Sequence, residues 1–172
     1  MKTPVLCSVA ALLLCGGLQA QDAAALIAQA RNGYNQVKNN LTKAAEKMPE
    51  ENYSFKPTPE MRTWAALMAH IIDTQARTCG MANGHQVEAP AGSKTAKAEI
   101  VAAMKTSFDE CDAAFEKLSP ENYLEQVGGG RGAAPRFAAL MRVLGHDNEE
   151  YGYASVYMRL KGVVPPSSDR SR

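Results

Sequence analysis

The residues that best suit a chemical function, by type and by spacing, are His146 and Glu150, which stand four positions apart in a stretch with helical character. Side chains four apart on a helix rise from one face, with Cβ atoms about 5–6 Å apart. A histidine and a carboxylate at this spacing can occupy two neighbouring positions around one metal ion. A third ligand must come from another helix. His70 lies inside a second helical pattern, whereas His85 follows a turn signal, so the spacing indicates a site of His70, His146 and Glu150.

The same residues also have an ordinary structural interpretation. A His/Glu pair four apart on an exposed helix face is commonly a weak surface ion pair. A histidine within an apolar pattern is commonly a hydrogen-bonded core residue, not a ligand. Spacing alone leaves both interpretations open.

Four helices must position these groups. Apolar residues recur at steps of three and four over 22–48, 64–79, a third stretch ending at Leu118, and 135–162. Many Ala, Met and Leu residues with little Val favour helices over sheets. The sequence therefore predicts an all-α domain.

Capping residues and breakers mark where these helices begin and end. Thr58, followed by Pro59, is expected to cap the second helix, and Ser93 or Thr95 the third. Residues 80–92 are expected to form a loop. Gly128 to Gly132 is predicted to be a flexible connection and not a phosphate-binding loop. A phosphate-binding loop needs a preceding strand and a following Lys-Ser or Lys-Thr, and the sequence indicates neither. Arg131 in this loop is a candidate for contacting an anionic substrate.

The first 20 residues have the features of a secretory signal peptide. A basic start at Lys2 precedes an apolar run from Val5 to Cys15 and small residues before Ala20, after which cleavage is expected. This run is too short to span a membrane, and the bulky Leu14 before Cys15 disfavours a lipid anchor. We therefore expect an exported, periplasmic or extracellular protein without stable membrane insertion.

The expected mature chain is one domain, residues 21–162, followed by a C-terminal tail at 163–172 whose end, from Ser167 to Arg172, is expected to be frayed. Removing residues 1–20 leaves 18 basic residues against 18 acidic ones, so the formal charge is zero. A neutral chain without a basic run has nothing to hold a phosphate backbone, so we expect no nucleic-acid partner. A small-molecule substrate and a homodimer formed through an apolar helix face are the expected partners.

Four segments together resemble the DinB family of DinB/YfiT-like metalloenzymes: residues 48–57, 69–75, 146–152 and 160–168. The resemblance implies a four-helix bundle with a crossover between helices two and three. It also implies one divalent metal, held by a His on the second helix and a His-x-x-x-His pair on the fourth. His70 matches the first ligand and His146 the second. Glu150 stands where the family's third His would stand.

Glu150 makes two outcomes equally consistent with the resemblance. Two His and one Glu are a competent catalytic set, and the harder carboxylate favours Zn, Ni, Fe or Mn. Alternatively, the substitution marks a non-catalytic bundle that has lost its metal and serves as a binding or interaction module. The two outcomes differ in whether the isolated protein contains metal.

Family resemblance implies hydrolase or thiol-transferase chemistry for the metal-binding alternative. Low-molecular-weight thiols are scarce outside the cytoplasm, which weakens the transferase version for an exported chain. Tyr153 and Tyr157 share the helix face of the ligands and are candidates for donating to a developing oxyanion. Asp147 and Glu149 are expected to face solvent.

Cys79 and Cys111 remain after removal of the signal peptide, and an even count in an exported chain allows a disulfide. In a tight antiparallel hairpin they would lie about 20 Å apart along the axis, too far to bond. A crossover would make helices two and three parallel and bring the cysteines level to within a few turns. Because the resemblance implies that crossover, it predicts the Cys79–Cys111 bond.

Overall fold

The computed structural model describes residues 5–170, with side chains described for residues 21–130 and 132–170. The predicted signal peptide at residues 1–20 lies outside the residues whose side chains are described. In the described part of the chain, no helix combines the length and apolar character needed to cross a membrane.

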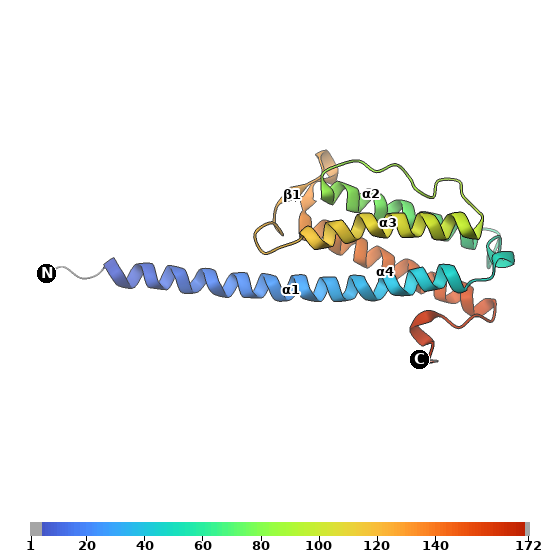
Figure 1. The fold of residues 1–172 in the computed structure, drawn as a ribbon, viewed down its shortest axis with the longest axis horizontal. Helices are drawn as coiled ribbons and strands as arrows, with labels where there is room; N and C mark the ends of the chain where they lie inside the picture. Colours follow the sequence, from blue (N-terminus) through green and yellow to red (C-terminus); the bar gives the residue numbers. More distant parts are fainter. Residues whose placement is uncertain (1–4, 171–172) are drawn as a thin grey trace.

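The protein is a four-helix bundle of α1 (Val5–Lys47), α2 (Trp64–Asn83), α3 (Lys97–Lys117) and α4 (Arg136–Leu160) (Figure 1). This confirms the predicted all-α class. The smaller elements of the described chain are a two-stranded antiparallel hairpin of β1 (Gln126–Val127) and β2 (Ala134–Pro135), and the 3-10 turns Glu50–Asn52, Gly130–Gly132 and Pro166–Ser168. The glycine-rich stretch is the connection of that hairpin.

Helices α2 and α3 run parallel, so the predicted crossover is confirmed. Gln75 donates to Ser107, and one turn later Cys79 is joined to Cys111 by a disulfide with a Cα–Cα distance of 4.9 Å. The connection between the two helices returns along the length of the bundle (Figure 1). The remaining contacts show that α1 and α4 run opposite to this pair. Lys97 at the start of α3 binds the Met48 carbonyl just after the end of α1.

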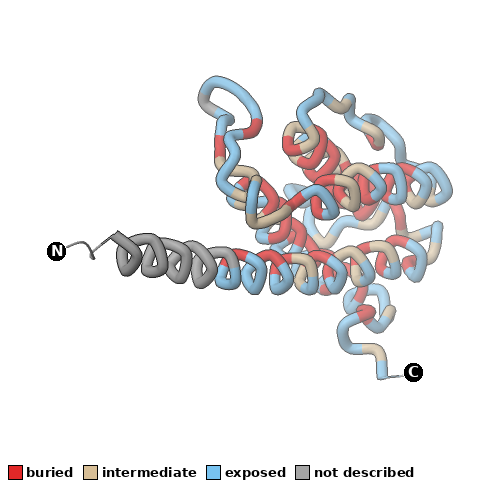
Figure 2. The backbone as a smooth tube through the Cα atoms, turned by 60° about the vertical axis from the view of Figure 1, so that its left-hand side comes forward, coloured by how far each residue is buried: buried red, intermediate tan, exposed pale blue. Residues whose placement is uncertain are grey.

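The core lies between the four apolar stripes, as the red segments facing inward in Figure 2 show. Among its fully buried side chains are Trp64, Leu41 and Phe108. Tyr34 stacks on Phe115 with ring centroids 4.1 Å apart, and its hydroxyl donates to Asp112 at 2.7 Å. Burial of these apolar surfaces is the main force that holds the helices against one another, and polar groups of buried aromatic residues, such as the Tyr34 hydroxyl, are hydrogen-bonded.

The start of α2 differs from the prediction. Thr58 begins a turn in which the Met61 amide donates to the Thr58 carbonyl, and the helix starts only at Trp64. Thr63 is the N-cap, because its extended backbone allows its hydroxyl to accept from the Ala66 amide at 3.2 Å. Burial of Trp64 at the first helical position therefore selected a later cap than the Thr-Pro signal indicated.

Helix α2 also ends later than predicted, and α3 begins without a capping side chain. α2 continues to Asn83 and stops at Gly84, whose φ of 93° lies in the left-handed region. Ala96 is the N-cap of α3, so the predicted caps Ser93 and Thr95 are wrong. The long crossover sets where α3 meets the bundle, and that tertiary constraint overrides the local signal.

The end of α4 follows the predicted stop at Gly162. With φ at 73°, Gly162 lets the Val163 amide donate to the Met158 carbonyl at 2.9 Å, which closes the last turn. The tail beyond it is not frayed over its described part. Ser167 bonds the Tyr151 hydroxyl in both directions, and Lys47 pairs with Asp169 at 2.7 Å. These contacts fold the tail back onto α1 and α4.

Candidate metal centre

His70 from α2 and His146 and Glu150 from α4 converge between the two helices, in a partly exposed space that is called the groove below. The two histidine Nε2 atoms lie 3.2 Å apart. Oε1 of Glu150 is 3.5 Å from Nε2 of His70 and 3.8 Å from Nε2 of His146. These three residues form a group that could hold a metal ion. The structure thus brings together all three side chains that spacing indicated.

The three atoms have the dimensions of a metal coordination triangle. Edges of 3.2, 3.5 and 3.8 Å define a circle whose radius is about 2.0 Å, close to the metal–ligand distances of Zn²⁺ with His and Glu. One point can therefore be at bonding distance from all three atoms without movement of either helix. An ordinary surface ion pair has no reason to bring a second imidazole nitrogen to the same point.

The burial of the ligands leaves the site open on one side. The Glu150 side chain is 9% exposed, that of His146 22% and that of His70 34%. The second oxygen of Glu150, Oε2, is buried and has no hydrogen-bond partner among the described residues. A buried carboxylate oxygen without a partner is costly, and a cation in the groove would remove that cost. The donor set therefore fits a divalent metal with an open coordination position.

Asp147 was expected to face solvent, and this expectation is wrong. Its side chain is buried, and its Oδ1 lies 3.4 Å from Nδ1 of His146. Metal-binding histidines commonly donate their second ring N–H to a carboxylate, which fixes the ring so that the other nitrogen faces the metal. A signal for this role was present, because Asp147 interrupts the apolar stripe of Leu140, Leu144, Tyr151 and Met158.

The two histidines have different electrostatic surroundings. Burial, with the charges of Arg62 and Arg77 adding to it, lowers the pKa of His70 against the opposing effect of Glu150. The hydrogen bond to Asp147 raises the pKa of His146, despite the opposing effect of burial. Burial also raises the pKa of Asp147. His70 therefore stays in the neutral, metal-binding form to a lower pH, whereas protons compete with a metal for His146 from a higher pH.

The predicted catalytic tyrosines occupy different environments. Tyr157 is buried, and its hydroxyl donates to the Arg62 carbonyl at 2.8 Å. Tyr153 is 48% exposed, and its hydroxyl contacts Glu149 at 3.3 Å on the surface of α4. Both tyrosines line a hollow of about 600 Å³ that Glu150 also lines. The Tyr157 hydroxyl is therefore already used in a structural hydrogen bond, and Tyr153 is the tyrosine whose hydroxyl can turn towards a ligand.

Arg131 was the predicted contact for an anionic substrate, and its side chain is outside the described residues.

Comparison with known proteins identifies the family of this chain. Residues 34–154 match the family model described as the DinB superfamily. The chain belongs to the DinB superfamily. A search of curated proteins finds no match.

Two solved DinB-like structures share the fold of this DinB chain. A DinB-like protein from Bacillus cereus is 16% identical with a TM-score of 0.69, covering 80% of this chain and 93% of its own. The DinB-like protein YjoA from Bacillus subtilis is 21% identical with a TM-score of 0.65, covering 83% and 99%. At these identities the similarity shows the fold alone, so the chemistry of this DinB protein must be argued from its own side chains.

Proposed function

We propose that this DinB protein is exported, binds one divalent metal ion through His70, His146 and Glu150, and is a metal-dependent enzyme. The observation that carries this proposal is the triangle of ligand atoms, which leaves one point about 2.0 Å from each of them. The partnerless Oε2 of Glu150 supports it independently.

Each residue has a distinct part in holding the ion. Asp147 accepts from Nδ1 of His146, which leaves the Nε2 lone pair aimed at the groove. The low pKa of His70 keeps its ring neutral, so this ligand needs no deprotonation. Glu150 supplies the negative charge that a neutral third imidazole would lack. This harder ligand is compatible with Zn, Ni, Fe or Mn.

A divalent metal with three protein ligands and an open position acidifies a bound water or thiol and polarises a carbonyl group. In this chain, the exposed edge of His70 marks the side from which water and substrate reach the site. Tyr153, at the rim of the adjoining hollow, is placed to donate a hydrogen bond to a substrate oxygen. These features support hydrolase or thiol-transferase chemistry.

Export favours the hydrolase over the transferase. The buried Cys79–Cys111 disulfide fits an oxidising compartment, and so does the signal-peptide pattern at the N-terminus. Low-molecular-weight thiols are scarce there, while water is not. We therefore place metal-assisted hydrolysis first.

A non-catalytic bundle is the second candidate function. The observation in its favour is that His70, His146 and Glu150 also satisfy one another in part, with contacts of 3.2 to 3.8 Å. Such a cluster could persist as a polar contact between α2 and α4. It leaves Oε2 of Glu150 and Oδ2 of Asp147 without partners, which is why we place it second.

Metal analysis of the full chain, purified without chelator, tests the proposal. We expect one metal per chain in the wild type and none in His70→Ala or His146→Ala, both still folded by circular dichroism. His85→Ala is the matched control, since His85 pairs with Glu110 away from the groove, and it should keep the metal. A folded wild type that takes up no Zn, Ni, Fe or Mn would overturn the proposal. Metal-dependent hydrolysis of chromogenic esters, lost in His146→Ala, separates an enzyme from a passive metal carrier.

A further inference from the structure

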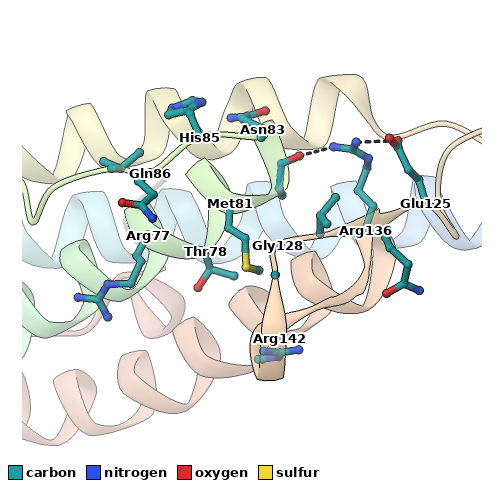
Figure 3. A pocket seen from close by; sticks show the side chains of 17 residues that line it. Arg77, Thr78, Met81, Asn83, His85, Gln86, Glu125, Gly128, Arg136 and Arg142 are labelled. Atoms are coloured by element: carbon teal, nitrogen blue, oxygen red, sulfur yellow. Dashed lines mark hydrogen bonds and ion pairs between the residues drawn. The ribbon is translucent and has the colours of Figure 1, made fainter.

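A larger hollow, of about 1090 Å³, lies beside the end of α2 and the start of α4. The β1–β2 hairpin and the turn after α2 complete its walls, and Figure 3 shows the side chains around it. Its size is that of a small-molecule binding pocket. The hollow is separate from the smaller one that Tyr153 and Tyr157 line.

Arginines give this hollow its charge. Arg136 is committed, because it binds the Ala82 carbonyl and pairs with Glu125 at 2.7 Å (Figure 3). Arg77 and Arg142 are exposed, and neither guanidinium has a hydrogen-bond or ion-pair partner among the described residues. Glu125 is the acidic residue in the lining, and Arg136 already neutralises it. Two positive charges in the hollow are therefore uncompensated.

Helix geometry places these two arginines on the same face as the metal ligands. Arg77 follows His70 by seven residues, which is about two turns of α2. It therefore lies about 10 Å further along the helix axis and points within about 20° of the direction of His70 around that axis. Arg142 precedes His146 by four residues, one turn of α4, or about 6 Å. Because α2 and α4 are antiparallel, both displacements run towards the same end of the groove.

We propose that Arg77 and Arg142 bind the anionic group of the substrate, a carboxylate or a phosphate, while its reacting group lies at the metal ligands. Guanidinium groups bind both anions through paired, charge-assisted hydrogen bonds. The spacing along the helices calls for an anionic group roughly 6–10 Å from the reacting atom. The smaller hollow is less suited, because Glu60 and Glu150 line it beside Arg62. This inference rests on the proposed function for the identity of the reacting end.

Binding of simple anions to the metal-free full chain tests the inference without any assay of activity. Inorganic phosphate and succinate serve as probes in isothermal titration calorimetry at low salt, because screening weakens such contacts. We expect each of Arg77→Gln and Arg142→Gln to weaken binding roughly tenfold, and the double variant roughly a hundredfold. Arg62→Gln is the matched control, an exposed arginine on the other side of the ligands, and should change the affinity less than about twofold.

The outcomes separate this inference from the proposed function. Unchanged anion affinity in the double variant, with an unchanged melting temperature, overturns the inference even if the protein binds metal stoichiometrically. Loss of anion binding in the double variant supports it, and the tighter of the two probes identifies the anion as phosphate or carboxylate. A protein that binds these anions but never metal keeps the anion site and overturns the proposed function instead.

Discussion

Helix α2 packs against α3 on one side and α4 on the other, and the two sides are built differently. Towards α3, Gln75 donates to Ser107, and Cys79 is bonded covalently to Cys111. These side chains are fully buried. Towards α4, His70 is partly open to water and faces the groove that contains Glu150. One side is closed by packing and a covalent bond, whereas the other keeps ionisable groups together.

The difference indicates which side the fold needs and which side serves function. Packed apolar groups and a disulfide stabilise a bundle at little cost. A buried carboxylate oxygen without a partner, such as Oε2 of Glu150, costs more than the about 1–3 kcal/mol of a neutral amide oxygen such as the partnerless Oε1 of Gln75. A helix that carries both has its scaffold on the α3 side and its chemistry on the α4 side. The following variants should therefore affect stability and metal binding separately.

Removal of a ligand has the largest expected effect. His146→Ala should weaken metal binding on the order of 10³-fold, more than the loss of a residue that only orients a ligand, because one of three donor atoms is lost. Competition of the loaded protein with a chromogenic chelator measures the affinity. His85→Ala should leave it unchanged. An unchanged affinity in His146→Ala would show that the metal binds elsewhere.

Loss of the disulfide should act on stability alone. The Cys79→Ala/Cys111→Ala double variant should lower the free energy of unfolding by about 3–4 kcal/mol, because the bond closes a 32-residue loop of the unfolded chain. Chemical denaturation measures this change. Metal stoichiometry should stay at the wild-type value. A double variant that also loses its metal would contradict the separation between the two sides of α2.

Asp147 should affect the metal affinity and the pKa of His146 without binding the metal itself. Asp147→Asn should weaken metal binding about 10- to 100-fold at neutral pH, because it loosens the orientation of His146. It should also lower the pKa of His146, whose rise comes first from its bond to Asp147. Nuclear magnetic resonance titration of the metal-free protein measures the pKa of His146, which should shift downwards. Glu149→Gln, an exposed neighbour, should shift it less. An upward shift would contradict this assignment.

The smallest expected effect is a gain in stability. Glu150→Met should raise the free energy of unfolding of the metal-free protein by about 1–2 kcal/mol, because an apolar side chain replaces a buried carboxylate oxygen without a partner. Glu149→Met on the exposed side of α4 should change it by less than about 0.5 kcal/mol. Denaturation in the presence of chelator measures both. Destabilisation by Glu150→Met would show that the carboxylate is a structural residue.

Particular residues show how far prediction from sequence reached. Spacing placed His146 and Glu150 on one helix face, and Gly162 ended α4 as expected, because both depend on local helix geometry. The caps of α2 and α3 were mispredicted, because burial of Trp64 and the path of the crossover decided where these helices begin. Asp147 was missed because helix geometry was taken to direct it away from His146 and into solvent, whereas its place in an apolar stripe was the stronger signal.

The sequence by itself determined the four amphipathic helices and the residue types available for a metal, because helical periodicity and ligand chemistry are properties of single segments. Tertiary structure alone decided that α2 and α3 run parallel, that Cys79 meets Cys111, and that His70 comes within 3.2 Å of His146. Those distances join residues 32 and 76 positions apart. They depend on how four helices share one core, which no single segment encodes.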